Sequence, residues 1–173
     1  MPFVLVRHGS VDFDAHPGRF RGHGFDLVPL TPRGVAEAER LASRMKDDSV
    51  DLILSSPMTR ALQTAMILSW TLGSRVEVEL DLHEWVPDRS QRWADGEVAV
   101  TAYQELLECG GEWPSGEERS WEPWSTVRRR VTAVLDRYEG DGNVAVVCHS
   151  GVIEALTGVG HTPPGGLVPF ERT

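Results

Sequence analysis

Five residues of this chain combine the side-chain types needed to handle a phosphoryl group, and each lies at or shortly after the end of a short apolar run: Arg7, His8, Arg60, Glu84 and His149. Arginine offers paired N–H donors to phosphate oxygens. A neutral imidazole is a competent nucleophile near pH 7, because its unperturbed pKa is about 6.5. A carboxyl group can protonate a leaving oxygen when burial keeps it partly protonated. These types indicate phosphoryl chemistry in which the anion clamp and the nucleophile need no metal ion.

The elements that must position these residues follow from apolar runs that alternate with helical periodicity. We expect β-strands at Phe3–Val6, Asp51–Leu54, Val76–Leu80 and Val144–Val147. We expect helices after Thr31-Pro32, after Ser56-Pro57, near Val98–Glu108, from Ser125 to Gly140 and at Gly151–Leu156. Thr31 and Ser56 are the expected N-caps, and Gly73 should end the second helix. This order predicts a three-layer α/β/α fold with a largely parallel central sheet.

The topology of such a sheet explains why distant residues should meet. Ligands of open α/β sheets bind beyond the carboxyl ends of the strands. Neighbouring strands lie only about 4.8 Å apart, so side chains at adjacent strand ends can share one small ligand. The two histidines, the two arginines and the glutamate therefore converge at one edge of the predicted sheet.

Length and composition limit the classes of protein to consider. The 173 residues suit one domain, and we expect a single domain over residues 1–173. The net charge of −9 argues against nucleic acid or an anionic membrane as partner. The N-terminal residues lack the features of a signal peptide, and no apolar run could span a membrane. With only two cysteines, Cys109 and Cys148, we expect no disulfide scaffold and a cytoplasmic protein.

Five segments, in the same order along the chain, resemble the motifs of the histidine phosphatase superfamily, which includes phosphoglycerate mutases. Leu5–Gly9 resembles its Arg-His-Gly signature, and Ser55–Ala65 is similar to the helix that carries its second arginine. The other three segments resemble its Leu-Thr-x-x-Gly, Leu-x-Glu and second-histidine motifs: Pro29–Gly34, Leu82–Glu84 and Val146–Gly151. The resemblance covers residues 3–156 and implies a phosphoglycerate mutase-like fold.

The resemblance also implies a role for each matching residue. His8 would be the nucleophile that becomes phosphorylated, and Glu84 would be the general acid and then the general base. Three residues would bind the phosphoryl group and stabilise its charge: Arg7, Arg60 and His149. Further substrate contacts are expected from three more positions: Ser10, Arg21 and Ser150.

The chain departs from the family pattern in three places. The loop Arg19–Asp26, which contains Arg21, is slightly longer than the family's usual spacing. Ser150 stands where glycine is common in the family. The sequence ends at Thr173, soon after the last expected helix, so we expect a shortened C-terminal end whose terminal strands are reduced or absent.

Residues 85–124 are expected to form a cap-like segment over the active site. Five of the six tryptophans lie in it, and they could form an aromatic wall for the leaving group or pack the segment onto the domain. Residues 81–122 hold eleven carboxylates and three arginines, a net charge of −8. Such a charge disfavours substrates with several phosphates.

Two other chemistries find little support in the sequence. Ser150 follows a strand and precedes a helix, but Cys148 and Val152 occupy the positions where a hydrolase nucleophile elbow requires glycine. A zinc site built from His8, His23, His149 and Cys148 has no ligand spacing behind it. We therefore expect neither a serine nucleophile nor a bound metal.

The sequence thus predicts a phosphomonoesterase that hydrolyses a small organic phosphate through a phosphohistidine on His8, without metal or cofactor. Two alternatives within the same superfamily are a phosphoglycerate mutase-type phosphoryl transfer and a protein phosphohistidine phosphatase. A non-enzymatic binding module is disfavoured by the complete set of catalytic side chains. The expected partner is a small-molecule phosphate ester, and the sequence leaves open whether the protein forms a homodimer.

Overall fold

In the computed structural model, which describes residues 3–15, 22–92 and 96–171, five strands form one sheet in the order β3-β2-β4-β1-β5. β1, β2, β3 and β4 are parallel to one another, whereas β5 runs antiparallel to β1 at one edge. The strands have the bounds β1 Phe3–Arg7, β2 Leu52–Ser55, β3 Arg75–Val78, β4 Val144–Cys148 and β5 Leu167–Phe170. β4 is buried along its whole length, as expected for a central parallel strand covered on both faces.

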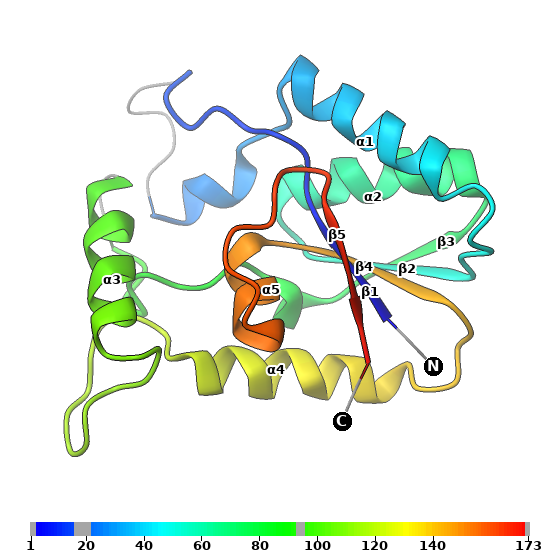
Figure 1. Cartoon of the computed structure of the whole chain (residues 1–173). Helices are drawn as coiled ribbons and strands as arrows, with labels where there is room; N and C mark the ends of the chain where they lie inside the picture. Colours follow the sequence, from blue (N-terminus) through cyan, green and yellow to red (C-terminus); the bar gives the residue numbers. More distant parts are fainter. Residues whose placement is uncertain (1–2, 16–21, 93–95, 172–173) are drawn as a thin grey trace.

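Helices cover both faces of this sheet and make the fold three-layered, as the sequence predicted (Figure 1). One face carries α1 (Pro32–Arg44) and α2 (Thr59–Leu72), and the other carries α4 (Trp124–Arg137) and α5 (Ser150–Thr157). α3 (Gly96–Glu108) lies to one side and adds Ala102 and Leu106 to the core cluster that also contains buried residues of the sheet, α4 and α5. Two short 3-10 helices complete the order, η1 (Gly22–Leu27) and η2 (Leu80–Leu82).

Local sequence signals explain where the first two helices begin and end. The Thr31 side chain caps α1 by accepting a hydrogen bond from the Gly34 N–H, and Pro32 occupies the first helical position. Gly73 ends α2 in the left-handed conformation, with φ of 75°. Ser56 is not the N-cap of α2, contrary to the sequence-based expectation. That helix begins at Thr59 without a side-chain cap, and the Ser56 hydroxyl is used elsewhere.

The described C-terminal end contains a strand, β5, at one edge of the sheet. β5 is four residues long and pairs with β1 from Phe3 to Val6. Pro169 lies within it, and proline is tolerated there because an edge strand has one side free of ladder hydrogen bonds. The turn before β5 also donates and accepts backbone hydrogen bonds at Arg7 and His8.

Three tryptophans of the segment that was predicted to form a cap lie in the hydrophobic core. Trp121 is fully buried, and Trp85 and Trp124 belong to the same core cluster. For Trp121 and Trp124 the aromatic-wall interpretation is therefore wrong, because these rings pack the segment onto the domain. Trp93 lies outside the described residues. No helix within the described ranges is long and apolar enough to cross a membrane.

Candidate active site

The loop after β1 is shaped by two glycines that lie in direct backbone contact. A Cβ placed on Gly9 would come within 2.3 Å of the Gly34 carbonyl oxygen, and one on Gly34 would come within 2.2 Å of the Ser10 carbonyl oxygen. The first turn of α1 therefore packs against the chain immediately after His8. This contact gives a physical reason for glycine in both the Arg-His-Gly and the Leu-Thr-x-x-Gly segments.

His8 is buried, and its hydrogen bonds define which ring nitrogen is free of a proton. Nδ1 lies 2.7 Å from the carbonyl oxygen of Gly9, and a carbonyl can only accept, so Nδ1 carries the hydrogen. Burial and the nearby Arg60 charge lower the pKa of His8 to about 3, which keeps the ring neutral. Nε2 is therefore the nitrogen with the lone pair, and the Arg60 Nε–H donates to it at 3.2 Å. Such a nitrogen can act as a nucleophile.

The two arginines approach this nitrogen from different elements. Arg60, in the first turn of α2, is buried, and its Nη1 donates to the Phe25 carbonyl oxygen at 3.0 Å. Arg7, the last residue of β1, donates from Nη1 to the carbonyl oxygen of Thr162 in the turn before β5. The buried Nε of Arg7 has no hydrogen-bond partner in the described part of the chain. That donor is available to an anion.

A second imidazole, His149, lies beside His8 with the ring centroids 5.1 Å apart. It is fully buried at the end of β4, and burial lowers its pKa well below the usual value, so the ring is neutral. Its Nε2 lies 2.7 Å from the Ser56 hydroxyl, which accepts from the Met58 N–H at 3.3 Å. The hydroxyl can donate its hydrogen to Nε2 or accept one from it, and when it donates, the imidazole hydrogen lies on Nδ1.

This Nδ1–H of His149 has no hydrogen-bond partner among the described residues and can donate to a phosphoryl oxygen. Sequence reasoning assigned Ser56 to helix capping and missed its contact with His149. The sequence places Ser56 just after β2, but the pairing of β2 with β4, which brings His149 to it, comes from the fold.

Glu84 follows η2 and lies against the start of α5. Its Oε1 accepts the Trp85 N–H at 2.8 Å, and the Gly151 N–H also bonds the carboxylate. Burial raises the pKa of Glu84, whereas those N–H groups and the charges of Arg60 and Arg7 oppose the rise. A carboxyl group with a raised pKa beside two arginines can donate a proton to a leaving oxygen.

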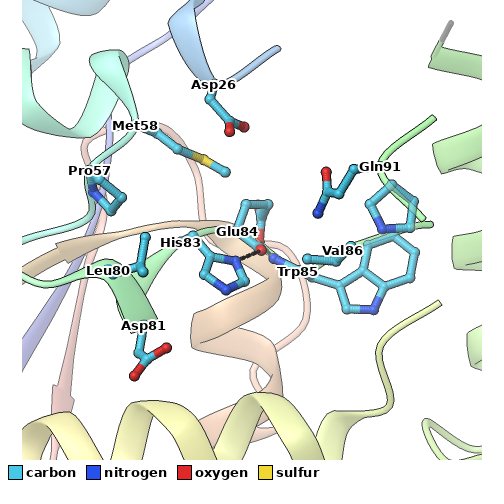
Figure 2. A pocket seen from close by; sticks show the side chains of 11 residues that line it. Asp26, Pro57, Met58, Leu80, Asp81, His83, Glu84, Trp85, Val86 and Gln91 are labelled. Carbon is cyan, nitrogen blue, oxygen red and sulfur yellow. Dashed lines mark hydrogen bonds between the residues drawn. The ribbon is translucent and has the colours of Figure 1, made fainter. Parts of the chain in front are cut away.

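A cavity of about 430 Å³ opens from Glu84 (Figure 2). Part of its lining is apolar, with contributions from Met58, Leu80, Trp85 and Val86. The rest of the lining is mainly polar: Asp26, Asp81, His83, Glu84 and Gln91, with Pro57 and Pro87 completing the wall. No arginine or lysine is among the lining residues in the described ranges, but the charge of Arg60 acts on two of the lining carboxylates, Asp26 and Glu84.

Three more residues were predicted to contact the substrate: Ser10, Arg21 and Ser150. The backbone N–H of Ser10 donates to a carboxylate oxygen of Glu37 at 2.8 Å, which ties this loop to α1. Ser150 is the first residue of α5 and is partly buried. Arg21 lies outside the described residues. No group of three potential metal ligands occurs among the residues that the structure describes.

The fold and this convergence of side chains define a phosphoryl-handling α/β protein, and sequence comparison identifies its family. The profile of the histidine phosphatase superfamily, branch 1, matches residues 3–166, so the chain belongs to this superfamily. The adenosylcobalamin/alpha-ribazole phosphatase of Escherichia coli is 28% identical over 160 residues, which cover 90% of this chain and 77% of that protein.

Solved structures of similar fold include both phosphatases and mutases. A phosphoglycerate mutase from Thermus thermophilus is 28% identical, with a TM-score of 0.66, covering 98% of this chain and 92% of that one. The native mycobacterial glucosyl-3-phosphoglycerate phosphatase has a TM-score of 0.75 at 22% identity, covering 97% and 88%. The second likeness shows the shared fold alone.

Proposed function

We propose that this protein is a phosphomonoesterase that hydrolyses a small organic phosphate through a phosphohistidine on Nε2 of His8. The observation that carries the proposal is the state of that imidazole. The ring is neutral, Nδ1–H is held by the Gly9 carbonyl, and the Nε2 lone pair faces Arg60. A nucleophile with an arginine beside it suits attack on a phosphate monoester.

The proposed reaction has two steps. In the first, Nε2 of His8 attacks the phosphorus and the ester P–O bond breaks, while Glu84 gives its proton to the leaving alcohol oxygen. In the second, water attacks the phosphorus and gives a proton to Glu84, and the N–P bond breaks to release inorganic phosphate. The phosphoryl oxygens would be bound by the donors that converge on His8: Arg7, Arg60 and His149.

The cavity beside Glu84 supports a choice of leaving group. Its carboxylate at Asp81 would repel a second phosphate or a carboxylate. Apolar side chains such as Leu80 and Trp85 offer contact area to a hydrophobic or ring-containing alcohol. We therefore propose that monophosphates of such alcohols have a higher kcat/KM than phosphoglycerate or sugar bisphosphates.

The two alternatives remain distinguishable by their products. A mutase, the activity named for the Thermus thermophilus relative, would return a rearranged phosphate ester instead of inorganic phosphate. A protein phosphohistidine phosphatase would act on phosphohistidine in proteins and would have little need of Glu84, because a phosphoramidate leaves with less help. Release of inorganic phosphate from a small ester that depends on Glu84 favours the phosphomonoesterase.

The nucleophile is tested by trapping the intermediate. Purified protein mixed with radiolabelled substrate and quenched should hold phosphate in an acid-labile, base-stable bond. His8→Ala should abolish both the label and turnover, since no other described residue is placed to form the bond. Turnover above a trace in His8→Ala would contradict the mechanism.

The same assays test the proposed independence from metal ions. EDTA should leave activity unchanged, and vanadate, which mimics the phosphoryl group in transfer, should inhibit. Loss of activity in EDTA that zinc or magnesium restores would assign the reaction to another class. These measurements use the wild-type protein and need no variant.

A further inference from the structure

The side chain of Arg130, on α4, donates hydrogen bonds to the backbone of the loop that carries Glu84. The Arg130 Nη1 donates to the carbonyl oxygens of Asp81 and His83, the second at 2.9 Å, and Nη2 donates to that of Glu84 at 3.4 Å. The remaining N–H groups bond Glu122 from Nε at 2.8 Å and from Nη2 at 3.0 Å. A guanidinium has five N–H donors, and all five are used here.

Glu122 holds the other half of the same loop. Its Oε2 accepts the Val86 N–H at 3.3 Å, and its own N–H donates to the Val86 carbonyl oxygen at 2.9 Å. Its carbonyl oxygen accepts the Trp85 indole N–H at 2.6 Å. The Arg130–Glu122 pair thus contacts the chain before and after Glu84, over residues 81–86.

The burial of this pair argues against a purely stabilising role. The Arg130 and Glu122 side chains are only 10% and 6% exposed. Desolvation of two charges can cost as much as their attraction returns, so a buried ion pair is weak support for stability alone. It fixes geometry well, however, because a planar guanidinium with every donor engaged has one allowed orientation.

We propose that Arg130 and Glu122 are positioning residues for the general acid Glu84. The pair does not touch the carboxyl group of Glu84; it bonds the backbone of residues 81, 83, 84 and 86 and the indole of Trp85. It therefore sets where the carboxyl group lies relative to His8 and to the leaving oxygen. The proposal rests on the proposed acid role of Glu84.

The test compares a leaving group that needs protonation with one that does not. Arg130→Gln and Glu122→Gln should lower kcat for an alkyl phosphate by roughly 10–100-fold, part of the 10²–10⁴ that general acid catalysis supplies. For nitrophenyl phosphate, whose leaving group needs little protonation, kcat should stay within about threefold. KM should change little for either substrate. Arg128→Gln is the matched control, because Arg128 is on the same helix and bonds Glu112 and the Ala155 carbonyl oxygen.

A double-mutant cycle separates positioning from general damage to the fold. In a Glu84→Gln background, adding Glu122→Gln should cause no further loss on the alkyl phosphate, because the group being positioned is already removed. Additive losses, or equal losses on both substrates, would overturn the proposal. Should Arg130→Gln fail to fold, Glu122→Gln still tests the positioning proposal, because glutamine keeps the side-chain volume and one of the two oxygen acceptors.

Failure of the underlying mechanism gives a different result. If the single variant Glu84→Gln loses kcat equally on both substrates, the acid role itself is wrong, whatever the results for Arg130→Gln and Glu122→Gln. If Glu84→Gln is selective for the alkyl phosphate while Glu122→Gln and Arg130→Gln keep full activity, only the positioning proposal fails. The two cases are read from separate variants in the same assay.

Discussion

At the scale of single residues, the environments of His8 and Glu84 push their pKa values in opposite directions. Burial and Arg60 lower the pKa of His8 to about 3, and burial raises that of Glu84. Both shifts favour the states that the proposed reaction needs at its first step: a neutral nucleophile and a protonated acid. A pair of titratable groups with pKa values moved in this way is typical of acid and nucleophile assignments in enzymes.

The pH profile of turnover should report this arrangement. His8 stays neutral until the pH approaches about 3, so its protonation should not limit the rate in mildly acidic solution. As the pH rises through the raised pKa of Glu84, the proton donor is lost and kcat for an alkyl phosphate should fall.

Glu84→Gln should remove this dependence on pH and lower kcat for the alkyl phosphate by roughly 10²–10⁴. Nitrophenyl phosphate should be affected much less, and stopped assays of both esters from pH 4 to 9 provide the measurement. Equal losses on the two substrates would mean that Glu84 is structural, and Asp81 and Asp88 would be tested next.

At the scale of elements, the start of α5 and the loop after η2 meet at a single glycine. A Cβ on Gly151 would lie 2.7 Å from Oε1 of Glu84 and 3.0 Å from the Cβ of Trp85. Gly151 is helical and its φ lies outside the left-handed region, so alanine is conformationally acceptable there. The glycine is needed because the carboxyl group of Glu84 occupies the space of a side chain.

Gly151→Ala should therefore impair catalysis more than folding. The added methyl group should displace the Glu84 carboxyl group and lower kcat for an alkyl phosphate by roughly tenfold or more, since a misplacement of about 1 Å can cost on the order of 10²-fold. The Tm should change little, because the higher helix propensity of alanine, worth up to about 1 kcal/mol over glycine, offsets the cost of the new steric contact. Gly96→Ala is the control, as a Cβ there meets nothing within 4 Å. A large drop in Tm with equal loss on all substrates would contradict this interpretation.

Most elements could be predicted from the sequence because their signals are local. The four parallel strands and the five α-helices lie within three residues of their expected bounds, set by apolar runs and by turn residues such as Thr31-Pro32 and Gly73. β5 was missed because four residues that include Pro169 carry no strand pattern, and its partner β1 lies at the opposite end of the chain.

The contacts of individual side chains could not be predicted in the same way. Ser56 has the sequence context of an N-cap, yet the neighbouring strand brings His149 to it and the hydroxyl bonds that ring instead. Arg130 lies beside the buried stripe of α4, which runs without a break through Val127, Val131 and Val134. The partner of such a partly buried charge is decided by the tertiary structure, which brings Glu122 to it.

At the scale of the whole molecule, the sheet order explains why the candidate site could be assembled from sequence alone. β4 lies between β2 and β1 and is parallel to both, so the residues that follow these three strands meet at one edge of the sheet. The phosphoryl end of the site is positive through Arg7 and Arg60, whereas the adjoining cavity is lined by carboxylates. This charge separation favours an ester with one anionic end.

The buried neutral histidines should also make stability depend on pH. The folded-state pKa values of His8 and His149 lie below the unfolded value of about 6.5, so as the pH falls below 6.5 the unfolded chain binds protons that the folded chain does not. Each group then removes about 1.4 kcal/mol of stability per pH unit, down to its folded-state pKa.

Glu84 acts in the opposite sense, because its raised pKa gives stability at low pH that is lost as the pH rises through the folded value. His83 acts in the same sense as His8 and His149, because burial lowers its pKa too, so the histidines outweigh the glutamate and the free energy of unfolding should fall by at least about 1 kcal/mol from pH 6.5 to 5. Urea unfolding at several pH values measures it. His149→Gln should flatten the dependence by removing one of the protons that the unfolded chain binds and the folded chain does not. A stability that stays constant or rises toward pH 5 would show that the two rings are not held neutral in the fold.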